Sequence, residues 1–183
     1  DTINYPSGVS VEGLAYDGDS TLWVTYHEGG VRRFHVAGGG SVAGAGELTP
    51  IDALDGFHNA YRLTVSGAHV YVADGGGGLK VVDRASGAIV GAADTAGFAK
   101  DVVVTGTMAV VAASAMGIQA FDVSDPTNPV PFDLIHTWGT ALTIDLFANG
   151  TRAVVANHDD VAVVDLSHPD AFNILASDRG TDK

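Results

Sequence analysis

Two short segments combine histidine with carboxylates and therefore hold side chains that suit acid–base or metal chemistry. His27 is followed by Glu28, and His158 is followed by Asp159. Imidazole nitrogens and carboxylate oxygens bind divalent metals, and the same pair can transfer protons. The candidate ligand-binding residues are His27, Glu28, His58, Asp74, His136, His158 and Asp159, with His27, His158 and Asp159 as the candidates for holding a divalent metal. Solvated loop residues in an Asp-rich protein are the simpler interpretation, so no catalytic residue is assigned.

The elements that would position these side chains occur four times along the chain. Each copy has a short apolar strand, a bend and a second apolar strand. The central valines of the first strands are Val24, Val72, Val111 and Val155, and the second strands close at His35, Asp83, Asp122 and Asp165. Valine and closing residue are 11 residues apart in three copies and 10 in the last. A repeat of this length predicts stacked β-units.

Each repeat is predicted to contain four strands. No stretch shows helical periodicity, and 24 glycines are scattered along the chain. The predicted innermost strands are residues 14–16, 63–65, 102–104 and 144–147, and the predicted outermost strands are residues 41–46, 88–92, 130–135 and 172–176. Four antiparallel strands per unit, repeated radially, predict an all-β fold of the β-propeller class.

The number of blades in the ring stays open at this point. The repeats span about 8–50, 57–97, 98–139 and 140–176 of one domain, 1–183. They fit a closed four-bladed ring, with residues 2–5 adding the last strand, or part of a larger ring completed by a second copy or by further sequence. A linear β-solenoid is the alternative, but its coils usually repeat in fewer than about 30 residues, and the central valines here are 48, 39 and 44 apart.

A propeller would gather some of the candidate residues on one face. The bends that follow the central valines lie on the same face as the connections between repeats. These segments contain four of the seven histidines and Asp74. The four are His27, His58, His136 and His158. A second group stands at or beside the starts of the innermost strands and is expected at the mouth of the central channel: Glu12, Arg62, Lys100 and Asp101. Their alternating signs predict mutual pairing that sets the geometry of the ring.

Two acidic patterns are interpreted as structural. Asp83, Asp122 and Asp165 each close a strand, where an Asp side chain can accept hydrogen bonds from the N–H groups of the following turn. The run from Asp17 with Glu28 eleven residues later has the ligand spacing of a calcium loop. The sixth position of such a loop must be glycine and is Leu22 here, so a hairpin turn is predicted instead.

Composition narrows the classes of partner. Nine basic against 22 acidic residues give a net charge of -13, which disfavours nucleic acid. The chain has no Cys, and no run reaches the roughly 20 apolar residues of a membrane helix. It begins at Asp1, which is expected of a processed mature end or a trimmed chain.

Several segments resemble the LVIVD repeat. Residues 70–75 running into 78–83, and residues 121–130 with their Asp-Pro turn, match it well. Residues 163–169 match fairly, and the first repeat departs, with His35 in place of the acid. The resemblance implies a propeller in exported or surface-anchored microbial proteins, often as one module of a longer chain, and brings no catalytic residues.

The function predicted from these observations is a non-enzymatic, extracellular or cell-surface propeller module for protein interaction, adhesion or self-assembly. The alternative is a propeller that binds a divalent metal or a small ligand on the histidine face, as a hydrolase or lyase would. The expected partner is another protein or a second copy of the chain, and no cofactor is assigned beyond that candidate metal.

Overall fold

The computed structural model describes residues 10–37, 48–168 and 171–178, and the regular structure within them is β-strand throughout. Runs of Val, Ala and Leu alternate with turns that contain Gly or Asn, a pattern that favours pleated, buried strands. The all-β prediction is confirmed for this part of the chain. None of these residues belongs to a helix long and apolar enough to cross a membrane.

The strands form four antiparallel sheets, each paired in chain order. Sheet 1 contains β1 (Gly13–Tyr16), β2 (Thr21–Thr25), β3 (Val31–Val36) and β4 (Leu48–Leu54). Sheet 2 contains β5 (Arg62–Ser66), β6 (His69–Ala73), β7 (Leu79–Asp83) and β8 (Ile89–Ala93). Sheet 3 contains β9 (Asp101–Thr105), β10 (Met108–Ala112), β11 (Ile118–Asp122) and β12 (Val130–Ile135). Sheet 4 contains β13 (Ala141–Leu146), β14 (Arg152–Asn157), β15 (Val161–Asp165) and β16 (Asn173–Asp178).

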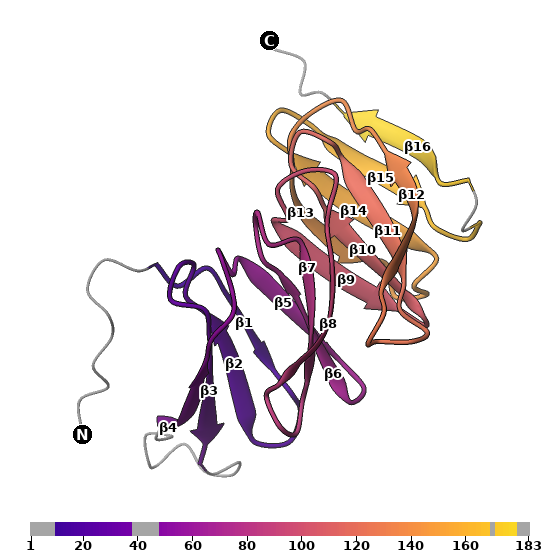
Figure 1. The fold of residues 1–183 in the computed structure, drawn as a ribbon. Helices are drawn as coiled ribbons and strands as arrows, with labels where there is room; N and C mark the ends of the chain where they lie inside the picture. The colour runs from indigo at the N-terminus through magenta and orange to yellow at the C-terminus, as the bar shows by residue number, and fades with distance from the viewer. Residues whose placement is uncertain (1–9, 38–47, 169–170, 179–183) are drawn as a thin grey trace.

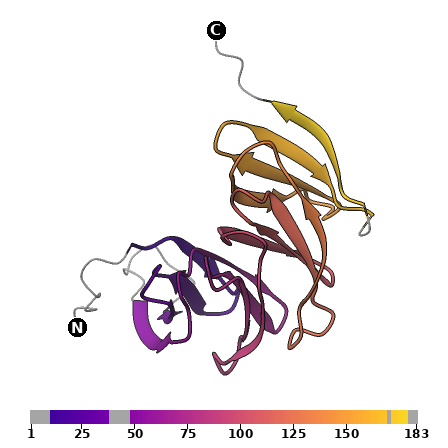
Figure 2. The same ribbon diagram turned by 45° about the horizontal axis from the view of Figure 1, so that its top comes forward.

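The sheets follow one another in a row, with sheets 1 and 4 at its opposite ends (Figures 1 and 2). The first strand of each sheet lies against the first strand of the next, so β1, β5, β9 and β13 form a continuous inner row. Sheets 2 and 3 therefore have a neighbouring sheet on both faces. Sheets 1 and 4 each pack against one other sheet within the described residues.

The hydrophobic core is divided into clusters between successive sheets. Representative members are Trp23, Leu63 and Val72 between sheets 1 and 2, Leu79, Val102 and Phe121 between sheets 2 and 3, and Ile118, Ile144 and Val155 between sheets 3 and 4. Burying one such Leu, Ile or Phe side chain contributes about 1.5–3 kcal/mol. The contact between sheets, rather than the isolated sheet, is thus the stabilising unit.

Most strand predictions agree with the structure, and the first repeat is the exception. The outermost strands predicted at 88–92, 130–135 and 172–176 correspond to β8, β12 and β16. The strand predicted at 41–46 lies outside the described residues, as do residues 2–5, and the fourth strand of sheet 1 is β4. Pro50 in β4 sits opposite Phe34, next to a bulge, and an edge strand tolerates such a proline.

Sheets 1 to 3 share one bend between their second and third strands. Its second residue has a positive φ in each sheet: 50° at His27, 54° at Gly75 and 56° at Ser114. His27 and Gly75 form β-bridges with the connection that leads into the next sheet, at Ala60 and Ala99, and Ser114 forms one with Ala141, the first residue of β13. The bend of sheet 4 closes one residue earlier, from Asn157 N to Asp160 O, which explains the shorter spacing of the last repeat.

A buried arginine links sheets 1 and 2. The Arg33 guanidinium pairs with Asp52 of its own sheet and donates to the backbone oxygens of Arg84 and Ala85 in sheet 2, both at 3.2 Å. A Cβ on Gly87 would lie 2.9 Å from Arg33 Nη2, so this turn needs glycine to receive the arginine. At the position of Arg33, sheets 2 and 3 have Val81 and Ala120, which make apolar contacts with the next sheet.

Candidate functional site

His27 belongs to an aromatic and cationic cluster between sheets 1 and 3. Its Nε2 is 3.0 Å from the Tyr61 hydroxyl, and the two rings meet edge to face. Lys100 Nζ lies 3.7 Å from the centroid of the Tyr61 ring and 5.0 Å from that of Phe98. A cation over an aromatic face is stabilised by the ring's quadrupole. The cluster thus ties together the connections before β5 and β9.

Asp74 is fully buried and holds one of those connections in place. Its carboxylate accepts hydrogen bonds from the backbone N–H groups of His58 and Asn59, at 2.9–3.0 Å. His58 Nδ1 is 3.7 Å from the same carboxylate, but its side chain is 70% exposed. Backbone donors are the partners a buried carboxylate needs when no cation is close. The structure therefore places Asp74 beneath the surface loop rather than beside the ring of His27.

The second histidine–carboxylate pair lies on sheet 4, away from the first. His158 Nδ1 is 2.6 Å from Asp159 Oδ1, and both side chains are exposed. They line an open hollow of about 420 Å³, together with Asn157, Asp160, Val161 and Asp178. Glu28 and His136 are exposed at other points of the chain. Within residues 10–37, 48–168 and 171–178, no three His, Cys, Asp or Glu side chains come close enough to hold a metal ion.

The residues predicted at the channel mouth separate into two groups. Asp101 Oδ2 accepts hydrogen bonds from Thr143 Oγ1 at 2.5 Å and Ile144 N at 3.1 Å, and it lies 3.9 Å from Arg62 Nη1. Burial raises the pKa of Asp101, and these hydrogen bonds and Arg62 offset part of that rise. Lys100 instead covers Tyr61, and Glu12 binds Thr25 O through its backbone N–H. Asp101 thus joins sheet 3 to sheet 4.

The acids that close the third strands make turn hydrogen bonds, as predicted. Asp83 accepts from the backbone N–H of Ser86 at 2.7 Å, Asp122 from that of Ser124 at 2.9 Å and Asp165 from that of Ser167 at 2.9 Å. Because these bonds favour the charged form, they lower the pKa of all three carboxyls.

The predicted hairpin turn at Asp17 is also confirmed. Its Oδ1 accepts from the backbone N–H groups of Asp19, Ser20 and Thr21, at 2.9–3.1 Å. Partial burial acts to raise the pKa of Asp17, but the backbone hydrogen bonds outweigh it and the net direction is downward. The Asp17 carboxylate therefore stabilises the hairpin turn.

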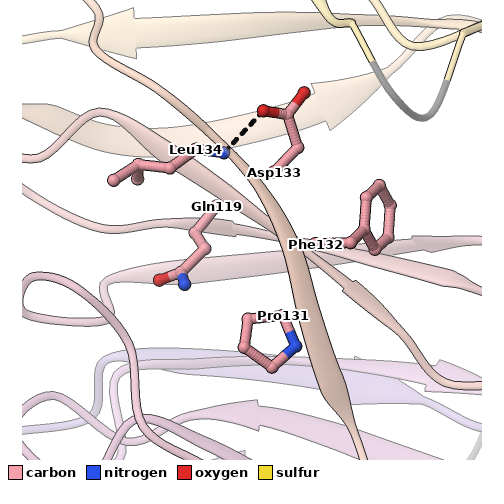
Figure 3. A pocket seen from close by; sticks show the side chains of 5 residues that line it. All are labelled: Gln119, Pro131, Phe132, Asp133 and Leu134. Carbon is pink, nitrogen blue, oxygen red and sulfur yellow. Dashed lines mark hydrogen bonds between the residues drawn. The ribbon is translucent and has the colours of Figure 1, made fainter.

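A shallow hollow of about 240 Å³ lies on the rim of sheet 3, lined by Gln119, Pro131, Phe132, Asp133 and Leu134 (Figure 3). Its polar groups belong to the fold. Gln119 Oε1 accepts from Ala96 N at 2.7 Å, and Asp133 accepts from Leu134 N at 2.8 Å and Phe172 N at 3.2 Å. The hollow therefore marks a join between neighbouring sheets and holds no group free for chemistry.

The two ends of the row expose apolar sheet faces. The leading face of sheet 1, turned away from sheet 2, carries Leu14, Tyr16, Leu22, Val24 and Phe34. Val24 and Phe34 are buried, but Leu14 is 67% exposed and Tyr16 is 52% exposed. At the position of Leu14, where each residue pairs with a central valine, Leu63, Val102 and Ile144 are 7%, 0% and 4% exposed.

The trailing face of sheet 4, turned away from sheet 3, carries Val154, Ala156, Val161 and Val163. Val161 is 47% exposed, whereas Val31, Leu79 and Ile118, which hold its position in sheets 1 to 3, are fully buried against the next sheet. These two faces were not among the residues singled out from the sequence. Aligning the four repeats position by position would have shown that both ends carry residues of the kind that the inner sheets bury.

Comparison with known proteins supports the architecture. The model of the family described as LVIVD repeat matches residues 58–84 and 96–132, which hold the first three strands of sheet 2 and most of sheet 3. No curated protein matches the chain. The resemblance to LVIVD repeats is confirmed on these two repeats.

Solved structures show a similar fold at low sequence identity. A β-propeller domain of Cps50 (Swd1) from Myceliophteria thermophila is 12% identical, with a TM-score of 0.76 over 98% of this chain and 62% of that one. The computationally designed Ika4 protein is 12% identical, with a TM-score of 0.65 over 86% of this chain and 92% of that one. The designed Ika8 protein is 11% identical, with a TM-score of 0.62, and this chain covers 62% of its length. The fold is that of a β-propeller, and its four sheets span less than two thirds of the Swd1 domain.

Proposed function

We propose that this chain, which carries LVIVD repeats on a β-propeller fold, is a non-enzymatic module that binds protein through the faces at the two ends of its row of sheets. The observation that carries the proposal is the exposure of Leu14 and Val161 at positions that every other sheet buries. Contiguous apolar surface of this kind marks protein interfaces. A covering protein would bury it as a neighbouring sheet does.

The hydrogen bonds that the candidate polar residues make within the fold support a binding role over a catalytic one. Asp74, Asp101 and the three strand-closing acids accept hydrogen bonds from the backbone or from neighbouring side chains. His27 is bonded to Tyr61. A general acid or base must instead reach a substrate within hydrogen-bond distance. Interaction, adhesion and assembly need no such group.

The proposed location is outside the cell or on its surface, in line with the family resemblance. Fractionation of the producing organism tests this part separately. The protein is expected in the medium or the surface fraction, and recovery in the cytoplasmic fraction alone would contradict it.

The binding role is tested with a photo-reactive amino acid placed on each terminal face. Tyr16 and Val161 are the positions chosen, and Val130, which is 48% exposed on an outer strand, is the matched control. After irradiation of the producing cells, we expect protein adducts from positions 16 and 161, identified by mass spectrometry. Adducts from neither face, or equally from position 130, would refute the proposal.

A second candidate is binding of a small ligand or divalent metal beside His158. The supporting observation is the hollow of about 420 Å³ that His158 and Asp159 line. Titration with Zn²⁺ in a calorimeter tests it, with His158→Ala and the distant His136→Ala as a matched pair. Loss of binding in the first variant alone supports this site, and unchanged binding in both excludes it.

A further inference from the structure

The two terminal faces are the two halves of one repeated interface. Wherever two sheets meet, the trailing face of one sheet covers the leading face of the next. Leu79 of sheet 2 and Val102 of sheet 3 lie in one such contact, and Ile118 of sheet 3 and Ile144 of sheet 4 lie in another. The trailing face of sheet 4 and the leading face of sheet 1 are therefore of complementary types, and one chain presents both.

We propose that a second copy of this chain covers both faces, so that sheet 4 of each copy packs against sheet 1 of the other and two copies close one ring. This inference rests on the proposed function and names the partner. A contact between two different faces is heterologous, and such contacts form a ring when the rotation between copies closes. With two copies the ring has a two-fold axis and leaves neither face exposed.

Charge on the two faces supports this pairing. Arg32 lies on the leading face, opposite Val24, and its Nε is buried with no hydrogen-bond partner among the described residues. On the trailing face, Asp145 pairs with Val154 and Asp178 pairs with Val161, and both carboxylates are exposed. At the position of Asp178, sheets 1 to 3 have the apolar residues Leu54, Ala93 and Ile135. The leading face thus carries an arginine and the trailing face carries two carboxylates, so the two faces have opposite charges.

The hollow beside His158 lies where a following sheet would make its first contact. In sheets 1 and 2 the equivalent bend bridges to Ala60 and Ala99, two residues before the next inner strand. The residue at that place in sheet 1 is Val11, which is 57% exposed. In the proposed ring, Val11 of a second copy fills the hollow that Val161 helps to line.

The first measurement is the mass of the purified chain by light scattering and sedimentation velocity over a range of concentrations. It is made at high salt, which screens the repulsion between chains of net charge -13. We expect a particle of twice the 18.7 kDa chain mass. A monomer at every concentration would overturn the inference.

Substitutions on each face test whether those faces make the contact. Leu14→Asp and Val161→Asp each place a carboxylate in an exposed position, so the fold of the single chain should be retained, as circular dichroism can check. Each variant is expected to raise the dissociation constant of the dimer at least about 10-fold, because the dimer would bury two unpaired charges, one at each contact. Val130→Asp, on an outer strand and at 48% about as exposed as Val161 at 47%, should leave it unchanged.

Mixing the two variants distinguishes a head-to-tail ring from any symmetric pairing of like faces. The Leu14→Asp chain keeps its trailing face, and the Val161→Asp chain keeps its leading face. Together they are expected to form one intact contact and so to associate more tightly than either variant alone. Dimers of Leu14→Asp that match the wild type, or a mixture no tighter than its components, would overturn the head-to-tail arrangement.

Failure of this inference is separable from failure of the protein-binding role. A monomeric chain whose photo-reactive positions 16 and 161 still give adducts with another protein would overturn the ring of two copies and retain the proposed function. A monomer without adducts at either position would overturn both.

Discussion

Sheets 2 and 3 and sheets 1 and 4 are built from the same repeat, yet their surroundings differ. In β10, the residues Ala109 to Ala112 are buried on both faces. In β14, the equivalent residues alternate, with Ala153 and Val155 fully buried against sheet 3 and Val154 and Ala156 only partly buried. Strand type follows from the local sequence, whereas the partial exposure of Val154 and Ala156 follows from the lack of a neighbouring sheet on that face within the described residues.

The largest effect that tests this contrast comes from two equivalent leucines. Leu63→Ala removes a side chain that is 7% exposed between sheets 1 and 2, and it should lower the free energy of unfolding by about 2–5 kcal/mol. Leu14→Ala, at the same position but 67% exposed, should change it by less than about 0.5 kcal/mol in the monomer. Urea unfolding of both variants provides the measurement.

The effect of Leu14→Ala on stability should also depend on protein concentration. If a second copy covers Leu14, the stability lost in Leu14→Ala should grow with concentration, because association stabilises the folded state. Equal losses in the two variants under monomeric conditions would contradict the open leading face.

Arg33 offers the next effect in size, at the interface between sheets 1 and 2. Arg33→Met would leave Asp52 and the backbone oxygens of Arg84 and Ala85 without their donor. We expect a loss of about 2–4 kcal/mol in the free energy of unfolding, below the upper range for buried pairs because Asp52 is 35% exposed. Arg32→Met, on the opposite face of β3, should cost less than about 1 kcal/mol. A reversed order in thermal and urea unfolding would refute this role.

Asp101, in the contact between sheets 3 and 4, gives a smaller effect that depends on pH. Because burial raises the pKa of this carboxyl, the folded state binds its proton more tightly than the unfolded state does. Its contribution to stability is therefore present at low pH and is lost as the pH rises through the range just above its ordinary value of 3.8.

Asp101→Asn keeps an acceptor oxygen for Thr143 and Ile144 but does not ionise. The stability of the wild type relative to this variant should fall as the pH rises from about 4 to 7, because only the wild-type carboxyl ionises in the folded state. Urea unfolding across that range measures it. A difference that stays constant or grows with pH would contradict the sign.

The smallest effect concerns the hydrogen bonds within the turns, which should respond in the same way in inner sheets and in end sheets. The side-chain hydrogen bond from Ser86 is the main cause that lowers the pKa of Asp83, and Ser167 acts in the same way on Asp165. Ser86→Ala and Ser167→Ala should therefore raise these pKa values toward 3.8, which carboxyl carbon NMR titration can follow. A rise in sheet 2 without one in sheet 4 would show that the turn depends on neighbouring sheets.

Sequence reasoning found the strands because their signal is local. The spacing of 11, 11, 11 and 10 residues anticipated the shorter bend at Asn157 to Asp160. The fourth strand of the first repeat was missed, because β4 begins at Leu48 and contains Pro50, which does not read as a strand. Such an edge strand is recognised only by its pairing with β3.

The candidate site was harder to foresee, since its contacts join distant residues. His27 was placed among carboxylates and lies against Tyr61, 34 residues away, and Lys100 was placed at the channel mouth and lies over the same ring. Asp74 was expected on the histidine face and is buried under the backbone of His58. Spacing within one repeat carries no information about which side chains of two neighbouring repeats meet.

By itself the sequence determined the repeat, the all-β character and the acid turns, because hydrophobic alternation and Asx hydrogen bonds act within a few residues. Tertiary structure alone decided which faces are covered. Leu14 and Leu63 are the same residue at the same position of one repeat, and only the presence of a preceding sheet makes one of them core and leaves the other exposed. The physical reason is that burial of apolar area depends on neighbours brought together over tens of residues.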